Sequence, residues 1–250
     1  MFLPDGMGIL PALLLIVSSF FTSALTASFG IGGGVALLAL LGMFIPVSAL
    51  IPVHGAIQIG SNTGRAWQQR RHIVSGVVWP FIAGSFLGAF VGAFFVVQLP
   101  DVILKLVLGV FVIVITWVKI PGLGELSRAG LALGSAVLAV LSMFFGATGP
   151  LLSSFFAHLI PDDRKALIAT HAAGMTVQHA LKVIVFAVAG FAFSAWLPFI
   201  LLMVASGYLG TVYGTRLLDK LPEKSFRRWF KIGLTLLALD LLRQGVMGLI

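Results

Sequence analysis

Two apolar segments of the chain each carry a stripe of mainly polar side chains at the spacing of one helical face. In both segments the stripe residues stand at offsets 0, 4, 7, 8 and 11. The first stripe consists of His54, Gln58, Ser61, Asn62 and Arg65, and the second of His171, Met175, Gln178, His179 and Lys182. Such offsets place side chains on one face of an α-helix. Imidazole, amide and cationic groups on one face can donate hydrogen bonds to an anion, so both stripes are predicted to line an anion pathway.

The ionisable members of the stripes suggest more particular roles. His54 and His171 are candidates for carrying a coupling proton, because histidine is the side chain whose unperturbed pKa permits switching near neutral pH. Arg65 and Lys182 are interpreted as cations of the pathway. Two other interpretations stay open: the stripe residues could simply bond neighbouring helices, with both histidines satisfied by backbone carbonyls, and the two cations could extend to the membrane interface.

A glycine-rich interruption of an apolar run precedes each stripe. Glycine costs a helix roughly 1 kcal/mol relative to alanine, so a break is expected at both places. Unwound backbone inside a membrane persists only where protein or a water-filled cavity satisfies it, and the amides of the helix that restarts there attract anions. We therefore predict a substrate cradle between the two breaks. The predicted substrate-binding residues are Gly30, Gly32, Gly33, Gly34, Gln58, Ser61, Asn62, Gly146, Thr148, Gly149, Gln178 and His179.

Composition places the chain in a lipid bilayer. Of 250 residues, 59% are hydrophobic and only 10% are charged, and the mean hydropathy is +1.11. These proportions leave too few polar side chains to cover a soluble globule of this size. The net charge of +8 resides in short loops between apolar runs, which indicates membrane orientation and not nucleic-acid binding. The chain has no cysteine, and no cofactor or metal site is predicted.

The apolar runs predict an all-α polytopic membrane protein. A full crossing needs about 20 residues, so the two short runs that follow the breaks are predicted to be half-helices or re-entrant elements. The first half of the chain has runs at 9–29, 34–45, 49–64, 73–97 and 102–118, and the second half at 129–145, 151–160, 166–181, 183–213 (with a bend near Gly190) and 226–247. The first segment lacks a basic flank and is expected to be retained.

The two halves align with one another, which indicates a duplication. Residues 1–120 are predicted to form the first transmembrane repeat, 121–128 the inter-repeat loop and 129–250 the second repeat. Small residues at small-xxx-small spacing are interpreted as helix contacts: Gly84, Gly88 and Gly92 in one half, and Ser206, Gly210 and Gly214 in the other. If each half has a broken element followed by three full spans, 13 Lys and Arg residues lie inside and three outside. This distribution favours inverted repeats with both termini outside.

The glycine break with Pro46 downstream, its weaker copy before Pro161 and the doubled layout together resemble the TauE/SafE sulfite exporter family, also called the 4-toluene sulfonate uptake permease family. The resemblance covers nearly the whole chain. It implies a polytopic inner-membrane protein that moves sulfite, sulfonates or other small organic anions, coupled to protons. The second break has Thr148 and Pro150 where the first has Gly32 and Gly34, so the two breaks are not expected to contribute equally.

The sequence thus predicts a secondary-active transporter for a small sulfur-containing anion such as sulfite or sulfoacetate, working by alternating access. Its partners would be that anion, protons and the lipid bilayer, with a homodimer as one possible assembly. An anion channel and a carrier of a non-sulfur carboxylate remain open alternatives. An enzyme is not expected, because no hydrolase or metalloprotease motif is present. No deep acidic residue is expected, except that Asp240 could lie within a span.

Overall fold

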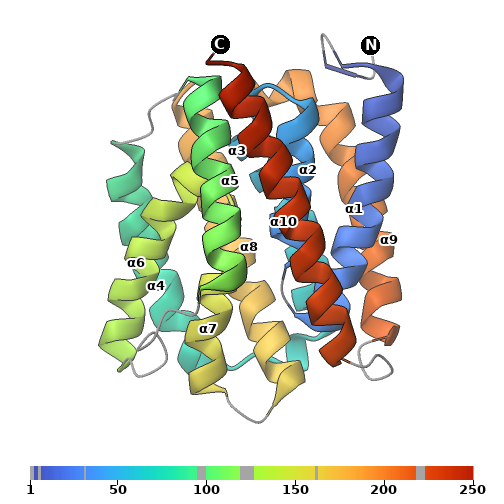
Figure 1. The fold of residues 1–250 in the computed structure, drawn as a ribbon. Helices are drawn as coiled ribbons and strands as arrows, with labels where there is room; N and C mark the ends of the chain where they lie inside the picture. Colours follow the sequence, from blue (N-terminus) through green and yellow to red (C-terminus); the bar gives the residue numbers. More distant parts are fainter. Residues whose placement is uncertain are drawn as a thin grey trace.

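The computed structural model describes residues 3–4, 7–30, 32–94, 100–118, 127–160, 163–217 and 223–249. Most of the predicted inter-repeat loop, residues 121–126, lies outside these ranges, as do the basic residues Lys119 and Lys220. The described residues form ten α-helices and two short 3-10 helices, and no strand occurs among them. Figure 1 shows the helices running up and down one bundle.

Five of the ten helices lie before residues 121–126 and five after them. The first set is α1 (Ile9–Phe29), α2 (Gly33–Phe44), α3 (Val47–Gln68), α4 (Ser75–Ala93) and α5 (Asp101–Trp117). The second set is α6 (Arg128–Phe145), α7 (Gly149–Leu159), α8 (Arg164–Val188), α9 (Leu197–Leu217) and α10 (Glu223–Met247). The 3-10 helices, Arg70–His72 and Phe193–Trp196, precede α4 and α9.

Four described helical segments are long and apolar enough to cross a membrane. They are Ile9–Phe29, Ser75–Ala93, Arg164–Val188 and Phe193–Leu217. The outward faces of these helices carry large exposed apolar side chains, such as Phe21 on α1, Phe90 on α4 and Leu209 on α9. A soluble protein rarely presents so much contiguous apolar surface, whereas lipid requires it. The protein is therefore a multi-pass membrane protein.

Both predicted breaks are present in the structure. α1 ends at Phe29, and the chain then passes through Gly30 and Gly32 with φ of 88° and 101° before α2 begins. α6 ends at Phe145, and Gly146 has φ of 73°. Side chains other than glycine rarely adopt these angles. The half-helices α2 and α7 have 12 and 11 residues, so at 1.5 Å per residue each reaches only about halfway across the hydrocarbon core.

One predicted segment boundary is wrong. From the sequence, one apolar run is predicted to end at residue 181 and the next to begin at 183. In the structure, α8 is continuous from Arg164 to Val188. The chain turns afterwards, at Gly190, where φ is 91°, which agrees with the expected bend. The stem of Lys182 is apolar along most of its length and its Nζ donates to the Gly146 carbonyl oxygen, so this residue does not interrupt the helix.

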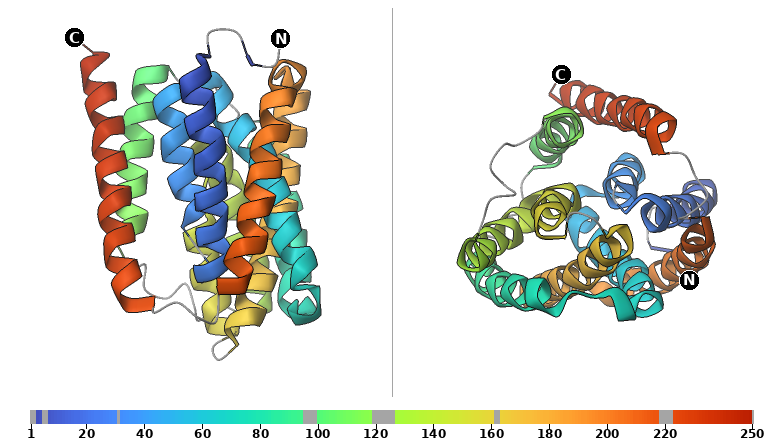
Figure 2. Two further views of the ribbon diagram at one scale, coloured as in Figure 1. Left: turned by 90° about the vertical axis from the view of Figure 1, so that its right-hand side faces the viewer. Right: turned by 90° about the horizontal axis from the view of Figure 1, so that it is seen from below.

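Counterpart helices of the two sets run in opposite directions. In Figure 1, α1 descends from the N-terminus while α6 ascends, and α3 descends while α8 ascends. Contacts between the sets are also interchanged, because α1 packs against α9 while α6 packs against α4. Figure 2 shows these two pairs and the pair α5–α10 at the periphery of the bundle. Inverted repeats would have this arrangement, and the inverted repeat itself stays a prediction.

The predicted small-residue contacts hold the two interchanged pairs together. A Cβ built on Gly84 or Gly88 of α4 would lie 1.9 or 2.1 Å from the carbonyl oxygens of Ala132 or Ala136 on α6. Gly210 and Gly214 of α9 make the corresponding approaches to α1, at 2.0 and 2.1 Å from the carbonyl oxygens of Phe20 and Ala24. Backbones this close leave no room for a side chain.

The half-helices are interior elements. In α2, buried residues include Leu37, Leu38 and Leu41, which belong to a core shared with α3, α5 and α10. In α7, Leu152 and Phe156 pack into a second core with Phe81 of α4. Because the apolar side chains of both half-helices are fixed in this way, their N-terminal ends are held inside the bundle.

Candidate functional site

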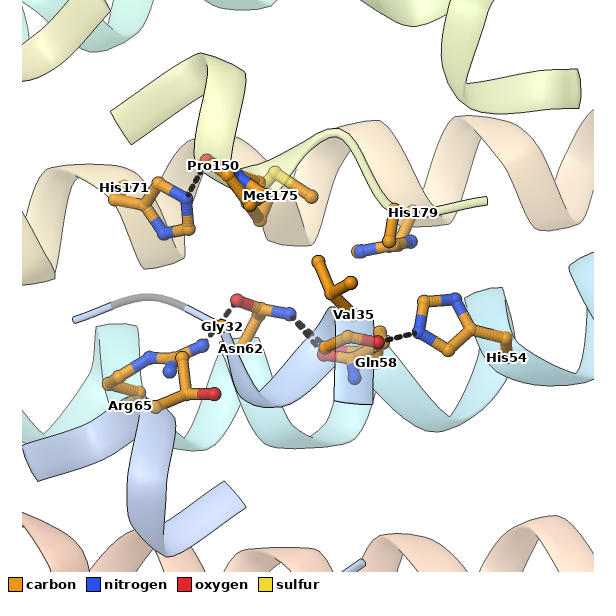
Figure 3. A pocket seen from close by; sticks show the side chains of 14 residues that line it. Gly32, Val35, His54, Gln58, Asn62, Arg65, Pro150, His171, Met175 and His179 are labelled. Carbon is orange, nitrogen blue, oxygen red and sulfur yellow. Dashed lines mark hydrogen bonds between the residues drawn. The ribbon is translucent and has the colours of Figure 1, made fainter. Parts of the chain in front are cut away.

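The two stripes face each other where α3 packs against α8. Because these helices run in opposite directions, the Arg65 end of the first stripe meets the His171 end of the second, as Figure 3 shows. At the other end, the rings of His54 and His179 lie 5.7 Å apart between centroids in an edge-to-face arrangement. The predicted stripes therefore line a common space and do not face lipid.

That space is a small cavity at the ends of both breaks. The part of the cavity that the centre of a water molecule can occupy has a volume of about 30 Å³. Nine of the predicted site residues line it: Gly32, Gly34, His54, Gln58, Asn62, Arg65, Gly149, His171 and His179. The other seven do not: Gly30, Gly33, Ser61, Gly146, Thr148, Gln178 and Lys182.

Arg65 is the most polar component of the cavity wall. Only 1% of the surface of Arg65 is exposed. Nη2 donates to Oδ1 of Asn62, and Nδ2 of Asn62 in turn donates to the backbone oxygen and Oε1 of Gln58 at 2.8 and 3.1 Å. Nε and Nη1 of Arg65 have no hydrogen-bond partner among the described residues. A buried guanidinium with two unused donors requires acceptors from elsewhere.

His54 and His171 each bond to the half-helix that precedes their own stripe. Nε2 of His54 lies 2.9 Å from the carbonyl oxygen of Gly34, and Nε2 of His171 lies 3.0 Å from that of Gly149. A carbonyl only accepts, so Nε2 is the donor in each case. Nδ1 of both rings is buried without a partner in the described structure. The interpretation that backbone carbonyls satisfy these histidines thus holds for Nε2, and proton transfer is left to Nδ1.

Two predicted residues of the second stripe, Gln178 and Lys182, form hydrogen bonds to the second break and do not line the cavity. Oε1 of Gln178 accepts a hydrogen bond from Oγ1 of Thr148 at 2.9 Å. Nζ of Lys182 donates to the carbonyl oxygen of Gly146 at 2.6 Å. Both bonds satisfy groups at or beside unwound backbone, which is the requirement for a broken helix inside a membrane.

The glycines of the first break have different surroundings. A Cβ on Gly33 would lie 1.8 Å from the backbone oxygen of Thr22, so Gly33 is packed against α1. A Cβ on Gly34 would lie 3.3 Å from Nε2 of Gln58, on the cavity side. Ala36 is the residue whose amide bonds back to Gly32, so the amides before it have no acceptor within the helix. Of these two glycines, Gly34 is the one that faces the cavity.

The second break offers fewer amide donors than the first, as its sequence indicated. A Cβ on Gly149 would lie 3.5 Å from Nε2 of His171, so this glycine also faces the cavity. The next residue, Pro150, has no N–H, and the amide of Leu152 is already bonded to Thr148. The unequal contribution of the two half-helices is therefore a property of the backbone.

Sequence reasoning did not identify several cavity residues. Thr26, Val35, Ala147 and Pro150 line the cavity but were not predicted site residues. Met175 was recognised as a stripe position and lines the cavity with an apolar surface. Thr26 could have been found, because Thr22 and Thr26 are polar residues four apart within an apolar span. The others carry no chemical signal in their residue type.

The charged side chains that the structure describes in the interior are all positive. Arg65 and Lys182 are both buried, at 1% and 0% exposure, so the alternative that they extend to the interface is wrong, and Lys182 does not belong among the outside charges. The two carboxylates whose side chains the structure describes are elsewhere. Asp163 caps the start of α8, and Asp240 is partly exposed and paired with Arg243 at 2.8 Å.

Broken helices, inward half-helices and a buried cationic cavity together define a class: a polytopic membrane protein of the transporter type. Comparison with protein families identifies it further. The family described as Sulfite exporter TauE/SafE matches residues 15–241, and the chain belongs to this family. Comparison with curated proteins and with solved structures gave no match. The family is one of exporters of sulfite and related sulfur-containing anions, which accords with a transport function.

Proposed function

We propose that the protein is a secondary-active transporter that moves a small sulfur-containing anion across the inner membrane, coupled to protons. The observation that carries this proposal is the state of Arg65. Its guanidinium is buried beside the cavity, two of its donors have no partner among the described residues, and the described buried side chains include no carboxylate. Uncompensated positive charge of this kind is stable only when an anion is available.

The cavity would hold such an anion from several directions. Nε and Nη1 of Arg65 are unused cationic donors, and either would give a charge-assisted hydrogen bond to an oxygen of the anion. The amides at the start of α2 and the positive end of its helix dipole would contact a third oxygen. Asn62 and Gln58 hold the guanidinium in place through the hydrogen bonds already described.

The dimensions of the cavity favour a small substrate. A cavity of about 30 Å³ for water-sized centres corresponds to only a few water positions, since one water needs roughly 10–15 Å³ by this measure. Sulfite has four non-hydrogen atoms and fits such a space better than a large aromatic sulfonate. We infer that sulfite or a short sulfonate such as sulfoacetate is the preferred substrate.

The interchanged packing of the two sets of helices supports a cycle of alternating access. The stripes on α3 and α8 belong to different repeats, and each half-helix contacts the stripe of its own repeat through a histidine. Rocking of one repeat against the other would open the cavity first to one side and then to the other. His54 and His171 remain candidates for accepting a proton at Nδ1 during this cycle.

The test is transport by purified protein in liposomes. Labelled sulfite, sulfoacetate and acetate would be supplied with and without a pH gradient. We expect sulfite to accumulate against its gradient only when a pH gradient is imposed, and acetate not to accumulate. Downhill sulfite flux that the pH gradient does not affect would indicate a channel instead. If verified folded protein moves none of these anions, the proposed function is refuted.

A further inference from the structure

Lys182 is buried in the bundle, outside the cavity wall. Its residue is 0% exposed, and its aliphatic stem runs beside α3, where a Cβ on Gly55 would lie 3.2 Å from Cδ of Lys182. Its Nζ reaches the unwound segment and donates to the carbonyl oxygen of Gly146 at 2.6 Å. His179, which does line the cavity, stands three residues earlier on α8. Lys182 is therefore close to the substrate space without being exposed to it.

The ionisable groups around Lys182 do not include a described carboxylate. α3 contributes His54, and α8 itself contributes His179, whose ring contacts that of His54. The break contributes the Gly146 carbonyl and, in its described part, no ionisable side chain. Arg65 and His171 stand at the other end of the cavity. Every charged or titratable neighbour in the described structure is thus neutral or positive.

This setting makes the charge of the amine depend on what fills the cavity. A buried ammonium without an opposite charge is costly by several kcal/mol. A neutral amine keeps an N–H that can bond to the Gly146 carbonyl, so losing the proton does not break that contact. An anion in the cavity supplies the missing negative charge and favours the ammonium form. Anion binding and protonation then promote one another, as linkage requires.

The hydrogen bond to Gly146 connects the protonation state of Lys182 to the backbone of the second break. Gly146 is the positive-φ residue of the second break, and its carbonyl is held from the side by Lys182. An ammonium donates a stronger, charge-assisted hydrogen bond than a neutral amine. His54 and His171 lack this link, because their Nε2 atoms bond to the first turns of the half-helices.

We propose that Lys182, and not a histidine, carries the coupling proton. One proton from solvent adds to the Nζ lone pair when the anion binds, giving an ammonium, and the same proton leaves when the anion departs. No other bond is made or broken. This inference rests on the proposed anion transport and specifies its coupling residue.

Proton uptake on binding provides the test. Sulfite binding would be measured by calorimetry at one pH in buffers of different ionisation enthalpy, which reports the protons taken up per anion bound. Sulfite itself titrates near neutral pH and so contributes to the proton uptake of every variant. The readout is therefore the difference in proton uptake between the native protein and a variant. We expect the native protein to take up about one proton more than Lys182→Arg, whose guanidinium is permanently charged.

Matched variants separate lysine from histidine. Lys105→Arg changes a lysine outside the cavity, bonded to Gln244 at 3.0 Å, and should keep native uptake. His54→Gln, His171→Gln and His179→Gln should each keep the extra proton whatever their affinity for sulfite. Lys182→Met should lose the extra proton and is the second test if Lys182→Arg does not fold.

The outcomes are distinguishable. Extra uptake that persists in the folded Lys182 variants, or that disappears in a histidine variant, overturns this inference while leaving anion transport intact. Failure of the native protein to bind sulfite at all instead refutes the proposed function, and with it the proton linkage that depends on it.

Discussion

At the scale of single residues, the site works through donors that the fold leaves unused. Arg65 has two such donors, and the Nδ1 atoms of His54 and His171 are acceptors without a partner among the described residues. These groups face a cavity in a region where unmet hydrogen bonds are costly. The arrangement is therefore better explained as a binding site than as a structural network, in which each donor would have found a partner.

Neighbouring glycines in the first break predict different effects of the same small substitution. Gly34→Ala would place a methyl group 3.3 Å from Nε2 of Gln58, so we expect weaker sulfite binding with thermal stability close to native. Gly33→Ala would place it 1.8 Å from the Thr22 backbone oxygen and should destabilise the fold by roughly 1–3 kcal/mol. Calorimetric binding and thermal unfolding measure the two effects. Equal stability of both variants would contradict these assignments.

Much of the site could be predicted from residue type and spacing, and the remainder depended on packing. The stripe offsets predicted Gln58, Asn62 and His179 on shared helical faces, and all three side chains line the cavity. The sequence could not show that Gly33 faces α1 while Gly34 faces the cavity, because both are glycines of one run. It also could not show that Lys182 turns to a backbone carbonyl, since a long flexible side chain can reach several partners.

At the scale of helices, close backbone packing holds the two repeats together. α4 contacts α6, and α9 contacts α1, through glycines that approach carbonyl oxygens. Both pairs join one repeat to the other. The spacing of these glycines was visible in the sequence, but their partners were not, because small residues on one helix do not specify which helix they meet.

Filling one of these contacts should weaken the whole bundle. Gly88→Leu would force its side chain into Ala136, whose carbonyl oxygen lies 2.1 Å from the required Cβ. We expect a loss of at least about 1–3 kcal/mol in stability, seen as a lower thermal unfolding temperature in detergent. Gly233→Leu in α10, where a Cβ meets nothing within 4 Å, is the matched control. An equally stable Gly88→Leu would exclude the observed α4–α6 packing.

At the scale of the whole molecule, basic residues gather at one end of the bundle. The end of α9 and the start of α8 lie at the lower end of Figure 1, as does the connection from α3 to α4, and both termini lie at the upper end. These lower segments include Arg70, Arg71, Arg164 and Arg216. The positive-inside rule then predicts that the lower end is cytoplasmic. The orientation predicted from the sequence uses the same charges, and it stays a prediction.

Single-cysteine labelling tests this topology directly, because the native chain has no cysteine. Arg71→Cys, Ser194→Cys and Leu249→Cys each replace an exposed residue. In intact cells, a membrane-impermeant maleimide should label positions 194 and 249 but not position 71. Lysis should make position 71 reactive, which controls for its accessibility. Labelling of position 71 in intact cells, or opposite behaviour of positions 194 and 249, would contradict the inverted arrangement.

The most direct test of the buried cationic site is sulfite transport by Arg65→Gln in the liposome assay, compared with Arg70→Gln. Arg70 is an exposed arginine shortly beyond the end of the same helix, stacked on Trp67, so it controls for the loss of one positive charge. Losing charge-assisted hydrogen bonds worth about 1.5–3 kcal/mol should weaken apparent sulfite affinity roughly 10- to 100-fold in Arg65→Gln and leave Arg70→Gln near native. Native transport by a folded Arg65→Gln would contradict the account.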